Sequence, residues 1–344
     1  MTKESAKALI PNGQTKNFNG IDVVKFICSI LVFMIHVPLI HSTFGGELSA
    51  LSNHINYGIQ RSFTRVAVPF FFVSSGFFLF RKMPDKLDVE IVKDYCFKLI
   101  RLLGVWSILL FFGGITHLWY LGATVVAVVF LSICLHFNIK HQHLLLIALA
   151  LYTVGLFGDS YFGFIKPFTE GGITGILYDI YMFFLGSTRN GLFMGFMFVL
   201  IGFFFAKGKI HMKAWVSAVG FVLSTIGLIA EVFLLTYYEI PDDYNMYVFL
   251  VPAVLFLFSF ASSLKLKDRP IYARLRSVST LIYILHLLLY SFVVFLAEIC
   301  KSLIGIDFLP FGFYVTLLLT LFAAFGIESL SHKDKFKWIK WIVA

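Results

Sequence analysis

Charged residues are scarce in this sequence: Asp, Glu, Lys and Arg make up 14% of its 344 positions, whereas 59% are hydrophobic. A soluble domain usually carries about a quarter charged residues. A water-facing surface could not be built from so few charges. The composition therefore excludes a soluble globular chain and predicts an all-α fold, a polytopic bundle of membrane-spanning helices.

Cysteine is also rare, and the signatures of several enzyme classes are missing. The four cysteines lie far apart without a CxxC pair, which argues against a disulfide framework and a zinc site. No HExxH, Walker loop, GxSxG or dinucleotide-binding fingerprint occurs. We therefore expect no metal site and no permanently bound cofactor.

Long hydrophobic runs, in contrast, fill most of the chain. We expect a polar tail at 1–19, one transmembrane domain at 20–328 and a basic tail at 329–344. An outer segment near 159–190 contains an apolar stretch, 173–187, that predicts a re-entrant or interfacial helix. The predicted spans, about ten in number, are 20–40, 64–80, 99–115, 118–136, 143–158, 191–206, 215–236, 246–263, 277–299 and 304–328.

The basic residues follow a topological pattern. Most of the 28 lysines and arginines fall in the two tails and in every second loop. Basic loops resist translocation, and an even number of spans returns the chain to its starting side, so both termini are predicted to be cytoplasmic. This pattern accounts for the net charge of +9, and we expect no nucleic-acid partner.

Ionisable groups inside the predicted spans are few and therefore informative. Each costs about 2.5 kcal/mol or more in hydrocarbon, so each calls for a partner or a wet cavity. Most of them fall toward the outer face, whereas Lys25 is near the inner face and His286 is near the middle. The residues are Lys25, His36, Arg65, His117, Arg189, Glu231 and His286.

Lys25 and His36 are the most suggestive pair. They are separated by 11 positions in span 1, which brings them to within about 20° of one helix face, roughly 16 Å apart along the axis. One elongated ligand could contact both. Alternatively, Lys25 extends to the cytoplasmic interface without a functional role.

The other candidates have two interpretations each. Arg65 either anchors span 2 at the interface or turns inward to hold an anion or an oxyanion. His117 lies at the outer start of span 4, where it is either part of the interfacial belt or a substrate contact. Glu231 either pairs with Arg65, Arg189 or a histidine, or stays protonated. His286 is either structural or catalytic.

At these residues the sequence resembles the acyltransferase 3 family of bacterial membrane acyltransferases. It resembles more closely the membrane half of the membrane-bound serine racemases found with vancomycin resistance. The resemblance covers residues 20 to about 287. The matching strings are GIDVVKFICSILVFMIH, FTRVAVPFFFVSSGFF, HLWYL, GDSYFG, GSTRNGLF and IYILH.

The resemblance implies a ten-span fold in the bacterial cytoplasmic membrane and the roles of several residues. In the family, the first span carries an arginine, ten residues and a catalytic histidine; here the spacing is kept by Lys25 and His36. Lysine keeps a cation for the phosphates of coenzyme A but loses bidentate geometry. Arg65 matches the arginine of the family's second span.

The expected function is a membrane O-acyltransferase that moves an acyl group, usually acetyl, from cytoplasmic acyl-CoA to a hydroxyl of an envelope glycan or small acceptor. His36 would take the hydroxyl proton, Glu231 would orient it, and Arg65 with Arg189 would stabilise the oxyanion. We expect His117, Arg189 and His286 to contact substrate and Lys25 to contact acyl-CoA.

Two other functions stay open. The membrane half of the racemases has been regarded as a serine uptake module, so the alternative is a membrane carrier for a small polar solute such as serine. A third is a structural subunit that helps a partner envelope enzyme. The racemases also carry a soluble pyridoxal domain, which is not found before Ala344, so racemisation is not expected of this sequence.

Overall fold

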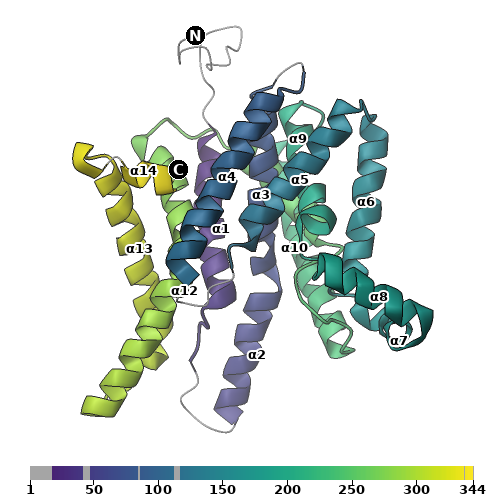
Figure 1. The fold of residues 1–344 in the computed structure, drawn as a ribbon. Coiled ribbons are helices and arrows are strands. Elements are labelled where there is room, and N and C mark those ends of the chain that lie inside the picture. The colour runs from purple at the N-terminus through teal and green to yellow at the C-terminus, as the bar shows by residue number, and fades with distance from the viewer. Residues whose placement is uncertain (1–17, 42–46, 84–85, 112–116, 337, 344) are drawn as a thin grey trace.

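The computed structural model describes residues 18–41, 47–83, 86–111, 117–336 and 338–343. Within these ranges the regular structure is entirely helical, with no strand. Figure 1 shows most of the helices aligned along one axis, as expected for a membrane bundle. The all-α prediction is confirmed.

Each of the ten predicted spans corresponds to a helix. By length and composition, six stretches could cross a membrane: 19–36, 49–80, 119–136, 214–237, 270–304 and 309–331. The count of ten and the sidedness of the termini stay predictions. The helices are α1 (Asn19–His36), α3 (Ala67–Phe80), α4 (Val89–Leu110), α5 (Trp119–His136), α6 (His141–Phe157), α9 (Phe196–Ala206), α10 (Ala214–Tyr237), α11 (Leu250–Ser263), α12 (Pro270–Ile304) and α13 (Gly312–Ser331).

Shorter helices join these. The sequence did not predict α2 (Glu47–Arg61), a polar helix that leads through η1 (Phe63–Val66) into α3. The predicted helix in the outer segment is α8 (Gly172–Leu185), which lies across the bundle axis in Figure 1. The remaining elements are η3 (Phe162–Phe164), α7 (Lys166–Thr169), η4 (Gly191–Gly195), η5 (Leu309–Phe311), η6 (Asp334–Phe336) and α14 (Trp338–Val343).

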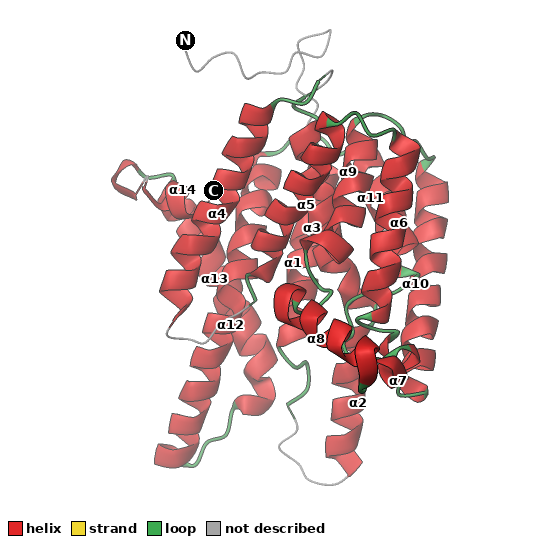
Figure 2. Cartoon of the chain, turned by 45° about the vertical axis from the view of Figure 1, so that its right-hand side comes forward, coloured by secondary structure: helices red, strands yellow, loops and turns green. Residues whose placement is uncertain are grey.

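Two glycines let α3 and α9 pack at very close range. A Cβ atom on Gly76 would lie 2.3 Å from the carbonyl oxygen of Val199, and one on Gly202 would lie 2.1 Å from that of Val73. Small residues permit such backbone contact between membrane helices, where packing rather than hydrophobicity drives association. This pair forms the centre of the bundle in Figure 2.

Helix α1 packs against α12 and α3. Near its start, the buried Asp22 accepts hydrogen bonds from Nε and Nη2 of Arg276 on α12, at 3.0 and 2.7 Å. A bidentate pair of this kind fixes both position and orientation. The register of α1 against α12 is thereby set at one end of the bundle, which determines what meets the histidine at the other end of α1.

Candidate functional site

Three histidines that are distant in the sequence meet at the end of α1. His36 is the last residue of α1, His117 precedes α5, and His286 lies within α12. Their ring centroids are 5.3 Å apart for His36 and His286, 4.9 Å for His117 and His286, and 6.4 Å for His36 and His117. His36 is exposed, whereas the other two are buried. A ligand would therefore reach His36 first.

Backbone carbonyls determine which nitrogens of the two buried rings carry hydrogen. His117 Nε2 lies 2.8 Å from the carbonyl oxygen of Tyr283, and His286 Nδ1 lies 3.0 Å from that of Ile282. A carbonyl can only accept, so these nitrogens are the donors. The other nitrogens, His117 Nδ1 and His286 Nε2, have no hydrogen-bond partner among the described residues and are left with lone pairs.

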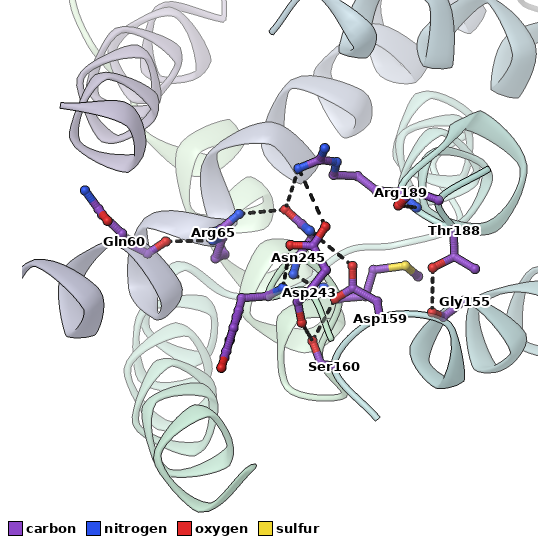
Figure 3. Close-up of polar contacts among 12 residues, drawn as sticks. Gln60, Arg65, Gly155, Asp159, Ser160, Thr188, Arg189, Asp243 and Asn245 are labelled. Carbon is purple, nitrogen blue, oxygen red and sulfur yellow. Dashed lines mark hydrogen bonds and ion pairs between the residues drawn. The ribbon is translucent and has the colours of Figure 1, made fainter. Parts of the chain in front are cut away.

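Arg65 and Arg189 meet at one amide, as Figure 3 shows. Arg65 Nη1 donates to Asn245 Oδ1 at 2.6 Å, and its Nε donates to the carbonyl oxygen of Gln60 at 2.7 Å. Arg189 Nη1 lies 3.4 Å from the same Asn245 oxygen and 3.8 Å from the carboxylate of Asp243. Two guanidinium groups are thus held in fixed positions from different parts of the chain.

No described hydrogen bond or ion pair joins either guanidinium to His36. Arg189 also lies over the ring of Trp119, with its Cζ 5.2 Å from the centroid. The side chains of both arginines remain partly exposed. The joint action of His36, Arg65 and Arg189 on a substrate therefore stays a prediction.

Asp159, which no sequence pattern singled out, holds this arginine site together. Its Oδ1 accepts from the backbone N–H of Asn245 and Met246 and from Ser160 Oγ, at 2.8 to 3.0 Å, and its Oδ2 accepts from Asn245 Nδ2 at 3.1 Å. Burial, with the nearby Asp243, raises the pKa of Asp159 against the opposing effect of these backbone donors. A carboxylate directly after a span, in GDSYFG, was the available signal.

Lys25 lines a separate cavity of about 260 Å³ between α1, α4, α5 and α12. Two further basic residues, Lys98 and Arg276, line the same cavity, as does the deeper Tyr283. The sequence singled out only Lys25, because the other two are in segments that look like ordinary basic loops. Helix packing alone places the three cations around one space.

The cavity of Lys25 and the histidine cluster share a wall. Tyr283 lines the cavity, and its hydroxyl donates to the carbonyl oxygen of His117 at 2.6 Å. His36 is not among the residues lining the cavity. The described cavity thus extends from Lys25 to Tyr283 and does not include His36, so a single ligand-sized space between Lys25 and His36 is not observed and stays a prediction.

Glu231 lies away from the histidine cluster and hydrogen-bonds the segment before α11. Its Oε1 accepts from the Tyr161 hydroxyl at 2.6 Å and the backbone N–H of Val248 at 2.7 Å, and its Oε2 accepts from the N–H of Phe249 at 2.9 Å. These amides precede α11, so Glu231 satisfies the unpaired donors at a helix start. The expectation that it pairs with Arg65, Arg189 or a histidine is wrong, and its contacts give no support to a catalytic role.

No metal site accompanies the histidine cluster. Among the residues that the structure describes, no group of three or more His, Cys, Asp or Glu could hold a metal ion. Two of the three imidazoles already donate a hydrogen bond from one ring nitrogen to a backbone carbonyl. The described arrangement is suited to proton removal at an exposed imidazole and to stabilisation of negative charge by nearby guanidiniums.

Comparison with known proteins is consistent with this chemistry. The model of an acyltransferase domain family matches residues 18–115. The chain is 29% identical over 271 residues to an amino-acid racemase of Enterococcus faecalis, covering 71% of this chain and 36% of the relative. It is also 29% identical over 301 residues to a serine/alanine racemase of Enterococcus gallinarum, covering 78% and 40%.

The chain thus spans about two fifths of the length of the curated relatives it matches. No solved structure matches it. The matched model is that of an acyltransferase domain, and six of the described helical stretches are long and apolar enough to cross a membrane. The resemblance expected from the sequence is therefore confirmed: over residues 18–115 the chain is similar to the acyltransferase domain family, and over most of its length it is similar to enterococcal amino-acid racemases.

Proposed function

We propose that the chain is a membrane O-acyltransferase that uses acyl-CoA, with acetyl-CoA as the first donor to test, and acylates a hydroxyl of an envelope glycan or a small acceptor. The single observation that carries this proposal is the placement of His36. It is the exposed member of a histidine cluster whose neighbour Tyr283 also lines a cavity surrounded by three cations.

His36 takes the proton of the acceptor hydroxyl in this mechanism. The hydroxyl oxygen attacks the thioester carbonyl carbon, the carbon–sulfur bond breaks, and the coenzyme A thiolate leaves and takes up a proton. Negative charge develops on the carbonyl oxygen during the attack. Arg65 and Arg189, fixed by Asn245, stabilise that charge, which is the work to which oriented guanidiniums are suited.

The donor binds with its phosphates near Lys25, Lys98 and Arg276. These residues line one end of the 260 Å³ cavity, and phosphate binds favourably where several ammonium or guanidinium groups converge. The thioester then extends toward Tyr283 and the histidines. In the predicted topology Lys25 lies at the cytoplasmic end, where acyl-CoA is available.

The decisive measurement is turnover of acetyl-CoA by the purified protein in lipid nanodiscs, followed through the release of free thiol. His36→Gln should reduce turnover at least about 100-fold, because a positioned general base typically contributes 10² to 10⁴ in rate. His54→Gln is the matched control, since His54 is exposed on α2 and its one printed contact among the described residues is to the local carbonyl of Ala50. Equal turnover of acetyl-CoA by the two variants would contradict the proposal.

The carrier function stays the second candidate because the relatives are named as racemases of amino acids. It predicts that the protein, reconstituted in liposomes, takes up labelled serine without any coenzyme A turnover. That result would replace the transferase proposal. If neither activity is found and His36→Gln has no effect on envelope composition in cells, a supporting role for a partner enzyme is favoured instead.

A further inference from the structure

A second cavity, of about 830 Å³, lies apart from the site described above. It shares no lining residue with the cavity that holds Lys25. Its walls come from the segments that follow α3, α5 and α9, which are the ends at the top of Figures 1 and 2. These are three of the basic loops that the sequence predicts to be cytoplasmic, and they close around one space.

Four lysines line this cavity: Lys86, Lys140, Lys207 and Lys209. No aspartate or glutamate is among its described lining residues. Lys207 is half-buried and donates through Nζ to the carbonyl oxygen of Met83, which fixes it at the base. The other three are exposed and form no ion pair among the described contacts. Converging positive charges of this kind favour a bound anion.

The start of α6 adds partial positive charge to the same space. Ile139, Lys140 and His141 line the cavity, and Lys140 is the N-cap residue of this 17-residue helix. No side chain caps the helix start, so the first-turn N–H groups lack a side-chain acceptor. The free N–H groups at a helix start, together with the helix dipole, make it a favourable site for a phosphate.

The remaining wall is mainly apolar, with His136 and Asn138 as its polar members. Phe80 and Phe203 form its buried part, and Leu87, Leu135 and Ile139 are partly exposed around it. A small inorganic ion would make no contact with these apolar side chains. A phospholipid would bind the lysines through its phosphate and pack its first methylene groups against the apolar side chains. The position at the ends of membrane helices suits the same kind of ligand.

We propose that this cavity is a binding site for the phosphate headgroup of an anionic phospholipid. The site does not depend on the transferase mechanism, because no residue of the histidine or arginine sites lines it. Its occupancy would link α3, α5, α6 and α9 through one ligand at the end of the bundle that carries the basic loops. The protein is then expected to be more stable in bilayers that contain anionic lipid.

The test measures binding of dioctanoyl phosphatidylglycerol to the purified full chain by native mass spectrometry, with dioctanoyl phosphatidylcholine as the neutral comparison. The double variant Lys140→Gln, Lys209→Gln should weaken phosphatidylglycerol binding on the order of tenfold, since each lysine near a membrane surface contributes to the attraction of anionic lipid. The control is Lys265→Gln, Lys267→Gln, which removes the same charge from another exposed basic segment outside the cavity.

Weakened binding in the cavity variant alone, with phosphatidylcholine unaffected, supports the proposal. Equal loss in both double variants overturns it, because the attraction is then a property of the whole charged surface. Inorganic pyrophosphate is added as a soluble competitor. A different result would be that the double variant weakens pyrophosphate binding while phosphatidylglycerol and phosphatidylcholine bind with equal affinity. In that case the site binds a soluble phosphate ligand and the lipid proposal is overturned.

Discussion

His117 and Tyr283 are joined by two reciprocal hydrogen bonds. The ring nitrogen Nε2 of His117 donates to the backbone carbonyl of Tyr283 at 2.8 Å, and the Tyr283 hydroxyl donates to the backbone carbonyl of His117 at 2.6 Å. This exchange holds the segment before α5 against α12. It also connects the wall of the Lys25 cavity to the histidine cluster, so a disturbance at Tyr283 should reach the proposed site of acyl transfer.

Tyr283→Phe tests that connection. The change keeps the ring that lines the cavity but leaves the His117 carbonyl without its donor, at a cost of about 1–3 kcal/mol. We expect the maximal rate of acetyl transfer to fall roughly tenfold while the KM for acetyl-CoA changes little. Tyr290→Phe serves as the control, because the hydrogen bond of the Tyr290 hydroxyl within the described part of the chain is a long one, 3.4 Å to His41. A larger KM with an unchanged rate would assign Tyr283 to donor binding instead.

Lys25→Gln should weaken coenzyme A binding without affecting the fold. Lys25 is half-buried in the cavity wall with Lys98 and Arg276 nearby, so its loss removes one cation from the expected phosphate site. The dissociation constant of coenzyme A should rise about five- to tenfold, the equivalent of about 1 kcal/mol for one lysine.

Equilibrium binding of coenzyme A measures this effect independently of transfer. Lys265→Gln is the comparison, since Lys265 is exposed and lines none of the described cavities. Identical dissociation constants for wild type and Lys25→Gln would mean that Lys25 extends to the interface and has no ligand.

Glu231→Gln should lower the stability of the protein and leave the rate of acyl transfer nearly unchanged. The amide NH₂ of glutamine would face one of the backbone donors of Val248 and Phe249 that Glu231 now accepts. Leaving a buried donor unpaired costs about 1–3 kcal/mol, so the thermal unfolding temperature in detergent should fall. Activity per folded molecule should stay within about twofold of wild type.

Tyr161→Phe is the companion variant, because it removes only the third hydrogen bond to Glu231. It should lower the unfolding temperature by less than Glu231→Gln does. A Glu231→Gln protein of normal stability that fails to transfer acyl groups would restore the catalytic role that the sequence suggested.

Gly202→Ala tests the close packing of α3 on α9. The added methyl group would lie 2.1 Å from the Val73 carbonyl oxygen, which forces the helices apart at a cost of about 1–3 kcal/mol or more. Gly104→Ala is the control in α4, where a Cβ meets nothing within 4 Å and alanine favours the helix by about 0.5–1 kcal/mol. The two variants should therefore shift the unfolding temperature in opposite directions, and a common direction would contradict the packing described here.

Helices α1 and α10 differ in how much of their role follows from the sequence alone. In α1 the helix itself carries Lys25 and His36, so their spacing and relative angle follow from helical geometry alone. Glu231 on α10 was also correctly placed within a span, but its partners come from Tyr161 and from residues 248 and 249. Contacts between distant segments produce no periodic pattern in a single sequence. The role of Asp159 was not predicted because its partners, residues 245 and 246, are also distant in the sequence.

By itself, the sequence determined that the chain is a helical membrane bundle, because the transfer of apolar side chains out of water depends on composition and run length. It also determined where most helices lie and that His36 and Lys25 share one helix. Only the tertiary structure decided that His117 and His286 join His36, that Arg65 and Arg189 share Asn245, and that Glu231 satisfies backbone donors. The physical reason is that a buried polar group acts through whichever donors and acceptors the fold brings within about 3 Å, and that distance is set by packing.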